Sequence, residues 1–84
     1  MYHQITDMKN LFYKKTTFNG NISKWNTSNV INMISMFANA KHFNQPIENW
    51  DVSNIINMRS VFYKATSFNI LRIMNGMAGL AYST

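Results

Sequence analysis

The chain has 84 residues, of which 46% are hydrophobic and 14% aromatic, enough for one small buried core and too apolar for disorder by composition. It contains no cysteine, so disulfides and thiolate metal sites are excluded. The formal net charge of +5 suits an anionic partner, but the lysines are spread along the chain instead of forming a block, which counts against nucleic acid.

The first four residues carry no targeting signal. They contain no basic region followed by an apolar run, so no signal peptide is predicted. No stretch of about 18 apolar residues occurs, so no membrane span is predicted. We therefore expect the chain, if it is made as written, to stay in the cytoplasm.

From residue 5 onward the chain repeats itself every 25 residues. The first unit covers residues 5–29, the second residues 30–54, and a partial third residues 55–69. A fixed period of this length is the sequence signature of a repeat protein. The positions that hold one residue type in all three units are Met8, Met33 and Met58; Phe12, Phe37 and Phe62; Phe18, Phe43 and Phe68; and Asn19, Asn44 and Asn69.

The first half of each unit is predicted to be a short helix. In residues 30–40 the apolar side chains recur at steps of three and four, the spacing of one helix face. The Ser-Asn pairs at residues 28–29 and 53–54 stand just before these runs, where helix N-caps belong.

The second half of each unit is predicted to be a turn followed by a short strand. Residues 19–21 and 44–46 contain the asparagine, glycine and proline that are typical of turns. Residues 50–53 then alternate between apolar and polar side chains, as a half-buried strand does, and residues 25–28 match them.

One strand and one short helix cannot bury an apolar face alone, but stacked units can. The sequence therefore predicts an α/β repeat solenoid in which each coil contributes a short parallel β-strand and a short helix. Phenylalanines and tryptophans of neighbouring coils are expected to stack on their counterparts. The asparagine of each Phe-Asn pair is expected to be buried and to bond to the backbone of the next coil.

The outer face of the predicted strands is the candidate binding surface. Equivalent polar positions recur there in both complete units, and repeat proteins commonly bind extended partners with such regular exposed rows. The candidate binding residues are Lys24, Asn26, Ser28, Asn49, Asp51 and Ser53.

Nothing in the sequence indicates an enzyme. The two histidines, His3 and His42, lie far apart with no cysteine beside them, so no metal site is predicted. The three acids, Asp7, Glu48 and Asp51, suggest no acid–base pair, and no phosphate-binding or dinucleotide motif occurs. We predict no catalytic residue, no cofactor, no metal and no small-molecule substrate.

Residues 43–69, which read FNQPIENWDVSNIINMRSVFYKATSFN, resemble a known repeat, and residues 18–44 match it as well. They resemble the repeats of BspA-like leucine-rich-repeat surface proteins and, more closely, a family first described as a mycoplasma protein of unknown function. Val61 stands where a methionine is usual. The resemblance implies leucine-rich-repeat-like coils, a place on the bacterial cell surface or outside the cell, and a role in adhesion or host contact.

Residues 70–84 leave the repeat pattern abruptly. Their apolar residues have helical spacing, so the segment is either a helical cap for the stack or a frameshifted remnant of a longer gene. The apolar residues with this spacing are Ile70, Ile73, Met74, Met77 and Leu80.

The leading hypothesis for function is a fragment of a bacterial surface repeat protein that acts as a protein-binding or adhesion module. Its partner would be a protein or a host surface, with further repeats of a longer parent chain as another possible neighbour. Two alternatives stay open: a non-functional truncated gene remnant, and a basic intracellular module that binds nucleic acid.

Overall fold

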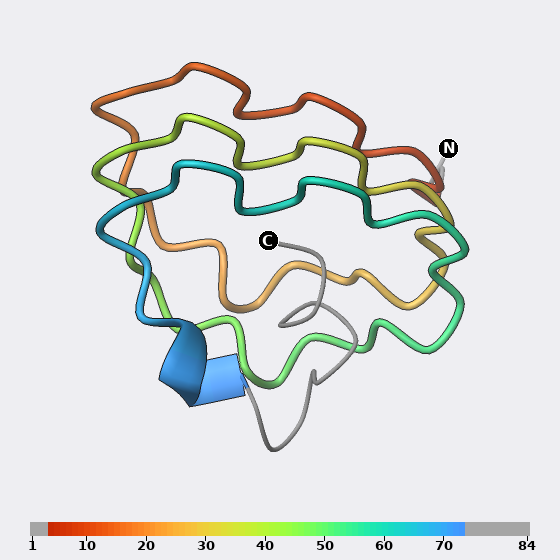
Figure 1. The fold of residues 1–84 in the computed structure, drawn as a ribbon. Coiled ribbons are helices and arrows are strands. Elements are labelled where there is room, and N and C mark those ends of the chain that lie inside the picture. The colour runs from red at the N-terminus through yellow and green to blue at the C-terminus, as the bar shows by residue number, and fades with distance from the viewer. Residues whose placement is uncertain (1–3, 74–84) are drawn as a thin grey trace.

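The computed structural model describes residues 4–73, and three layers of chain lie one on another in it (Figure 1). We call residues 5–29, 30–54 and 55–69 the first, second and third layers. Parallel bridges join Asp7 to Asn32 and Asn32 to Asn57, which places neighbouring layers 25 residues apart in register. Equivalent positions of the repeat therefore lie directly above one another.

The predicted α/β solenoid, with a strand and a helix in each coil, is wrong. Within residues 4–73 the only helix is the 3-10 helix η1, Ile70–Ile73, and the only β pairing is the two isolated bridges. Residues 34–39, inside the predicted helix, form turns, and residues 50–53 form no strand. The layers are built from successive turns and irregular extended chain.

Backbone hydrogen bonding explains why no helix forms in the first half of each layer. The N–H groups of Leu11, Tyr13 and Lys15 donate to the carbonyl three residues earlier, closing one tight turn after another. The N–H groups between them leave the layer and donate to the next one. These interlayer bonds run from Met8, Asn10, Phe12 and Lys14 to Asn32, Ile34, Met36 and Ala38, and from Met33, Ser35, Phe37 and Asn39 to Asn57, Arg59, Val61 and Tyr63, at 2.7–3.0 Å.

Two positions in every layer adopt a left-handed backbone conformation. They are the third residues of two turns in each layer, where a type II turn requires a positive φ. Such a conformation costs about 1–2 kcal/mol for residues other than glycine, asparagine or aspartate, so the interlayer bonds must offset it. The residues are Asn10, Ser35 and Ser60 at the first position and Lys14, Asn39 and Lys64 at the second, with φ between 53° and 60°.

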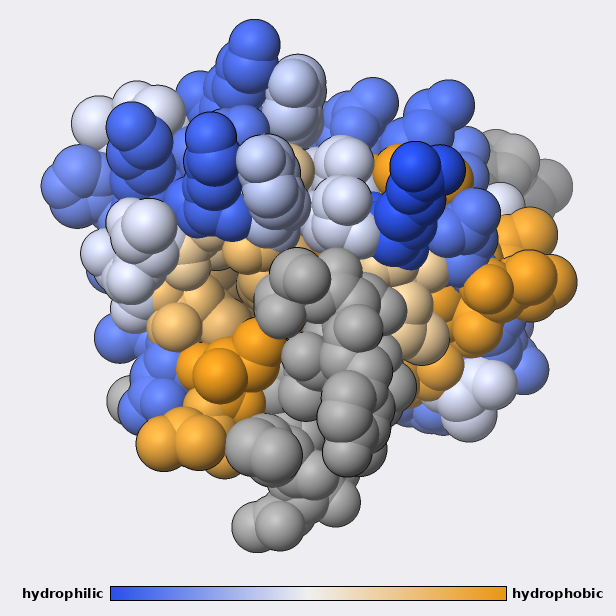
Figure 2. Space-filling model, viewed as in Figure 1, coloured by the Kyte–Doolittle hydropathy of each residue, from blue (hydrophilic) through white to orange (hydrophobic). Residues whose placement is uncertain are grey.

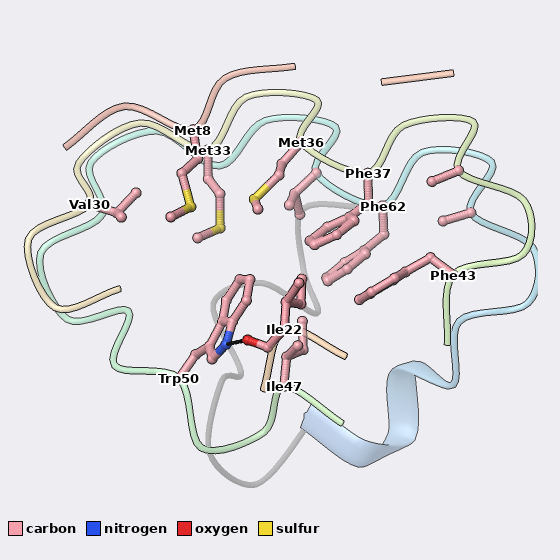
Figure 3. Close-up of a cluster of buried hydrophobic side chains, with 13 residues drawn as sticks. Met8, Ile22, Val30, Met33, Met36, Phe37, Phe43, Ile47, Trp50 and Phe62 are labelled. Carbon is pink, nitrogen blue, oxygen red and sulfur yellow. Dashed lines mark hydrogen bonds between the residues drawn. The ribbon is translucent and has the colours of Figure 1, made fainter. Parts of the chain in front are cut away.

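The core consists of columns of phenylalanine rings, as the repeat predicts (Figure 3). Phe37 stacks at 5.5 Å on both Phe12 and Phe62, and Phe43 stacks at 5.9 Å on Phe18. Every second N–H group in these turns donates to the next layer, while the aromatic rings point inward. The same turns therefore supply both the interlayer hydrogen bonds and the core. Phe37 and Phe43 are fully buried.

The two tryptophans, which were expected to stack on each other, have different surroundings. The indole N–H of Trp50 donates to the carbonyl of Ile22 at 3.1 Å, and its ring tilts against Phe37 (Figure 3). Trp50 is 5% exposed, whereas Trp25 is 41% exposed at the first layer. The burial of each tryptophan therefore depends on whether a preceding layer covers it.

The asparagine ladder of the Phe-Asn pairs is present. Asn19 Oδ1 accepts the N–H of Asn44 at 2.8 Å, and Asn44 Oδ1 accepts the N–H of Asn69 at 3.0 Å. Asn19 and Asn69 are exposed and Asn44 is half-buried, contrary to the expectation that these side chains are buried. Asn69 Oδ1 in turn accepts the N–H of Leu71 at the start of η1. The rest of the predicted cap or remnant, residues 74–84, lies outside the described residues.

Candidate binding surfaces

The predicted polar row consists of the same local motif in two layers. Asn26 Oδ1 accepts both the backbone N–H and the hydroxyl of Ser28, at 3.1 and 2.7 Å. Asp51 Oδ1 accepts the same two groups of Ser53, at 3.0 and 2.6 Å. The structure thus brings Asn26 and Asp51 to equivalent places in neighbouring layers, each closing a tight turn.

Residues beside this row hold the two layers together. The Thr27 hydroxyl, which is buried, donates to the Asp51 carbonyl at 3.0 Å, and Asn54 Nδ2 donates to the Ser28 carbonyl at 2.7 Å. These contacts give the row a structural role in addition to any role in binding. Of the six predicted binding residues, Ser28 is half-buried and the other five are exposed.

The negative charge of the row comes from one carboxylate, that of Asp51. The hydrogen bonds from Ser53, first from its hydroxyl and then from its backbone N–H, lower the pKa of Asp51 below its ordinary value. Asn26 is the neutral counterpart in the first layer. At neutral pH the row therefore presents a single negative charge, with the ammonium group of Lys24 on the same exposed half of the layers.

A second surface was missed by the sequence analysis. The first halves of the layers, residues 5–18, 30–43 and 55–68, carry six of the eight basic residues of the chain and one acid, Asp7, which is exposed near the start of the first layer. All six side chains are exposed, and we call this surface the basic face. It consists of Lys9, Lys14, Lys15, Lys41, Arg59 and Lys64.

The register of the layers gathers these charges into columns. Position 9 lies above 34 and 59, so Lys9 and Arg59 share a column with Ile34 between them. Position 14 lies above 39 and 64, so Lys14 and Lys64 share a column with Asn39 between them. Hydrophilic side chains gather along this edge of the molecule (Figure 2).

Two tyrosines belong to the basic face. Tyr13 and Tyr63 are 40% and 49% exposed, and the Nζ of the following lysine lies 5.2 and 5.3 Å from each ring centre. At this distance the ammonium groups of Lys14 and Lys64 are attracted to the ring faces. The lysines are therefore held over aromatic surface, which reduces the entropy they lose when they meet a partner.

These lysines were predicted to be spread out because they are far apart along the chain. Aligning the units column by column would have shown positions 9 and 59, and 14 and 64, to be basic in matching places. Within residues 4–73 no group of three or more histidine, cysteine or acidic side chains could hold a metal ion. No helix in this part of the chain is long and apolar enough to cross a membrane.

The layered register, the phenylalanine columns and the recurring turns define a repeat domain with a 25-residue unit. The chain belongs to the family described as "Mycoplasma protein of unknown function, DUF285", whose model matches residues 2–73. No curated protein and no solved structure matches the chain. The match supports the predicted mycoplasma-type repeat family. It does not support the narrower resemblance to BspA-like proteins.

Proposed function

We propose that this domain is a non-catalytic module that binds an acidic protein partner through its basic face. The observation that carries the proposal is the charge distribution: six exposed basic residues against one acid, Asp7, on the first halves of the layers. A surface with a large excess of one charge sign attracts an oppositely charged partner over roughly a Debye length, about 8 Å at physiological salt.

The geometry of the face suits an extended partner. Successive layers in a parallel arrangement lie about 4.8 Å apart, so the paired charges of one column are about 10 Å apart. Columns 9/59 and 14/64 run across the layers, and the tyrosines stand beside the second column. An extended acidic segment can contact both columns at once, whereas a compact ligand would meet only one.

The polar row around Asn26 and Asp51 has a lesser part in the proposal. Its oxygen atoms already accept hydrogen bonds from Ser28 and Ser53, so fewer groups are left to receive a partner. Asp51 would also repel an acidic segment. A place on the bacterial cell surface and a role in adhesion, which the resemblance to BspA-like proteins implies, are part of this proposal.

Binding of a fluorescent acidic peptide, measured by anisotropy at several salt concentrations, tests the proposal. Replacing Lys14 and Lys64 by glutamine is expected to weaken binding by roughly tenfold and to reduce its salt dependence. The matched control is Lys24→Gln, which removes a charge from the other half of the layers. If the affinity falls by the same factor per charge removed in both variants, the basic face is not the binding site.

An RNA oligonucleotide of equal charge distinguishes the alternative of nucleic-acid binding. Acidic proteins and RNA share the electrostatic attraction, but only RNA has bases that stack on exposed tyrosine rings. Tighter binding of RNA than of the peptide, lost on replacing Tyr13 and Tyr63 by leucine, would favour that alternative over an acidic protein.

A further inference from the structure

The link between Asn19 and Gly20 differs chemically from the other asparagine links of the chain. Among residues 4–73, Asn19 is the only asparagine that a glycine follows. Asparagine is a chemically labile residue, because the backbone nitrogen of the next residue can attack its side-chain amide carbon. A side chain on that next residue hinders the approach, and glycine has none. Within this range, the amide of Asn19 is therefore the least hindered toward such an attack.

The packing around Gly20 explains why a glycine stands there. A Cβ atom at residue 20 would lie 2.9 Å from Cε1 of Phe18, too close for two carbon atoms that are not bonded. The Phe18 ring is itself held by stacking on Phe12 and Phe43, with ring centres 4.0 and 5.9 Å apart. The core therefore leaves no space for a side chain that would shield Asn19.

The second layer holds the amide oxygen of Asn19 in place. Oδ1 of Asn19 accepts the backbone N–H of Asn44 at 2.8 Å, and the Asn19 backbone carbonyl accepts a hydrogen bond from Nε2 of Gln45 at 2.9 Å. Residues 18–22 belong to no helix, strand or turn, so no regular hydrogen-bond pattern fixes the backbone there. The Asn19 side chain is exposed, so water reaches it.

We propose that Asn19 is a site of spontaneous modification, at which its side-chain amide cyclises onto the backbone of Gly20. The Gly20 nitrogen forms a bond to Cγ of Asn19, and the bond from Cγ to Nδ2 breaks. The side-chain nitrogen leaves as ammonia, taking the proton of the Gly20 N–H. Water then opens the succinimide ring at one of its two carbonyl carbons, which gives aspartate or isoaspartate at residue 19. This inference does not depend on the proposed acidic partner.

The hydrogen bond from the second layer favours the first step. Negative charge develops on Oδ1 of Asn19 as the nitrogen attacks Cγ, and the backbone N–H of Asn44 already donates to that oxygen. A donor that is in place before charge develops on an oxygen lowers the barrier, as in the oxyanion holes of acyl-transfer enzymes. The fold therefore assists the reaction at Asn19 in addition to exposing the side chain.

Both products change the contact between the first and second layers. Aspartate keeps an oxygen acceptor for the N–H of Asn44 but adds a negative charge, because its carboxyl group is ionised at neutral pH. Isoaspartate places the former side-chain carbons in the main chain, so the path from residue 19 to Gly20 becomes longer. The carbonyl that accepts the hydrogen bond from Gln45 then becomes part of a carboxylate. The modification therefore alters the asparagine ladder between these two layers.

Peptide mapping by mass spectrometry, after incubation of the folded chain in warm neutral buffer, tests the proposal. Asn44 is the matched internal control, because its Oδ1 accepts the N–H of Asn69 in the same ladder but a glutamine follows it. Asn19 is expected to convert roughly tenfold faster than Asn44, which corresponds to about 1.4 kcal/mol in activation free energy. Equal rates at the two asparagines, or conversion of Asn19 only after unfolding in guanidinium, would overturn the proposal.

Gln45→Gly tests whether a following glycine creates the same site in the second layer. In this variant Asn44 keeps its hydrogen bond from Asn69 and gains the unhindered neighbour that Asn19 has. Asn44 should then convert roughly tenfold faster than it does in the native chain, and circular dichroism should show the native fold. A folded Gln45→Gly variant in which Asn44 converts no faster than before would also overturn the proposal.

Discussion

The first and second layers share most of their key residues but differ in burial. Phe37 is fully buried and Phe12 half-buried, and Trp50 is 5% exposed where Trp25 is 41% exposed. Among residues 4–73, the second layer has a neighbouring layer on both sides, and the first layer has one on one side only. Equivalent residues of these two layers therefore differ in burial because their positions in the stack differ.

Because burial differs between the two layers, equivalent substitutions in them should have unequal effects on stability. A side chain between two layers loses contacts on both sides when it is truncated, and a side chain at the first layer loses them on one. Because the net stability of a small domain is about 5–15 kcal/mol or less, this difference decides whether the fold survives. Matched pairs of variants in the two layers can test it.

The largest effect is expected for the central phenylalanine. Phe37→Ala removes a ring stacked on Phe12, Phe43 and Phe62 and should cost about 3–5 kcal/mol, enough to abolish cooperative thermal unfolding. Phe12→Ala, at a half-buried position, should cost about 1–2 kcal/mol and keep a cooperative transition at lower temperature. Equal destabilisation of the two variants in denaturant titrations would show that position in the stack does not set the cost of losing the ring.

The tryptophans give the next largest difference. Trp50→Phe removes the indole N–H and leaves the carbonyl of the buried Ile22 without its partner, at a cost of about 1–3 kcal/mol. Trp25→Phe, at an exposed position, should change the stability by less than about 0.5 kcal/mol. Urea unfolding followed by far-UV circular dichroism measures both, and a larger cost at Trp25 would show that the first layer is covered in solution.

The left-handed positions should show a smaller effect, with opposite signs for opposite substitutions. Asn39→Ala introduces a side chain that tolerates a positive φ poorly and should cost about 1 kcal/mol. Ser35→Asn places the better-tolerated residue at the other left-handed position and should raise stability by about 0.5 kcal/mol. Thermal melts check both, and a stabilising Asn39→Ala would contradict the left-handed backbone conformation of Asn39.

The smallest effect is the pH dependence of the two polar turns. The Ser53 hydrogen bonds lower the pKa of Asp51 in the folded state, so their stabilising contribution is present above the unfolded pKa. It is lost as the pH falls through the lowered folded pKa. Asp51→Asn, which copies Asn26, should therefore flatten the loss of stability in acid, and an unchanged acid-unfolding profile would argue that the Asp51 turn contributes little.

Helix and strand were both predicted wrongly, and the reason lies in the backbone. Steps of three and four residues describe a helix face, but the same spacing arises when consecutive tight turns each bond a residue to the one three before it. Met33, Met36 and Phe37 satisfy either pattern. Nothing in the side chains reveals that alternate N–H groups donate to the next layer.

The predicted polar row and the basic face differ in how far the sequence could reveal them. Asn26 and Asp51 were identified because they occupy one repeat position in consecutive units. Lys14 and Lys64 lie two units apart with Asn39 between them, so a reading along the chain shows scattered charges. Their common column follows only once the register between layers is known.

The 25-residue period, the phenylalanine stacks and the hydrogen bonds of the asparagine ladder could be predicted from the amino-acid sequence alone. These follow from identical residues at fixed spacing, since equivalent side chains must meet when units stack. The backbone conformation and the basic face, in contrast, depend on how the layers pack. A peptide N–H can donate within its own turn or to a neighbouring layer at similar free energy, and the choice depends on whether that neighbour is present.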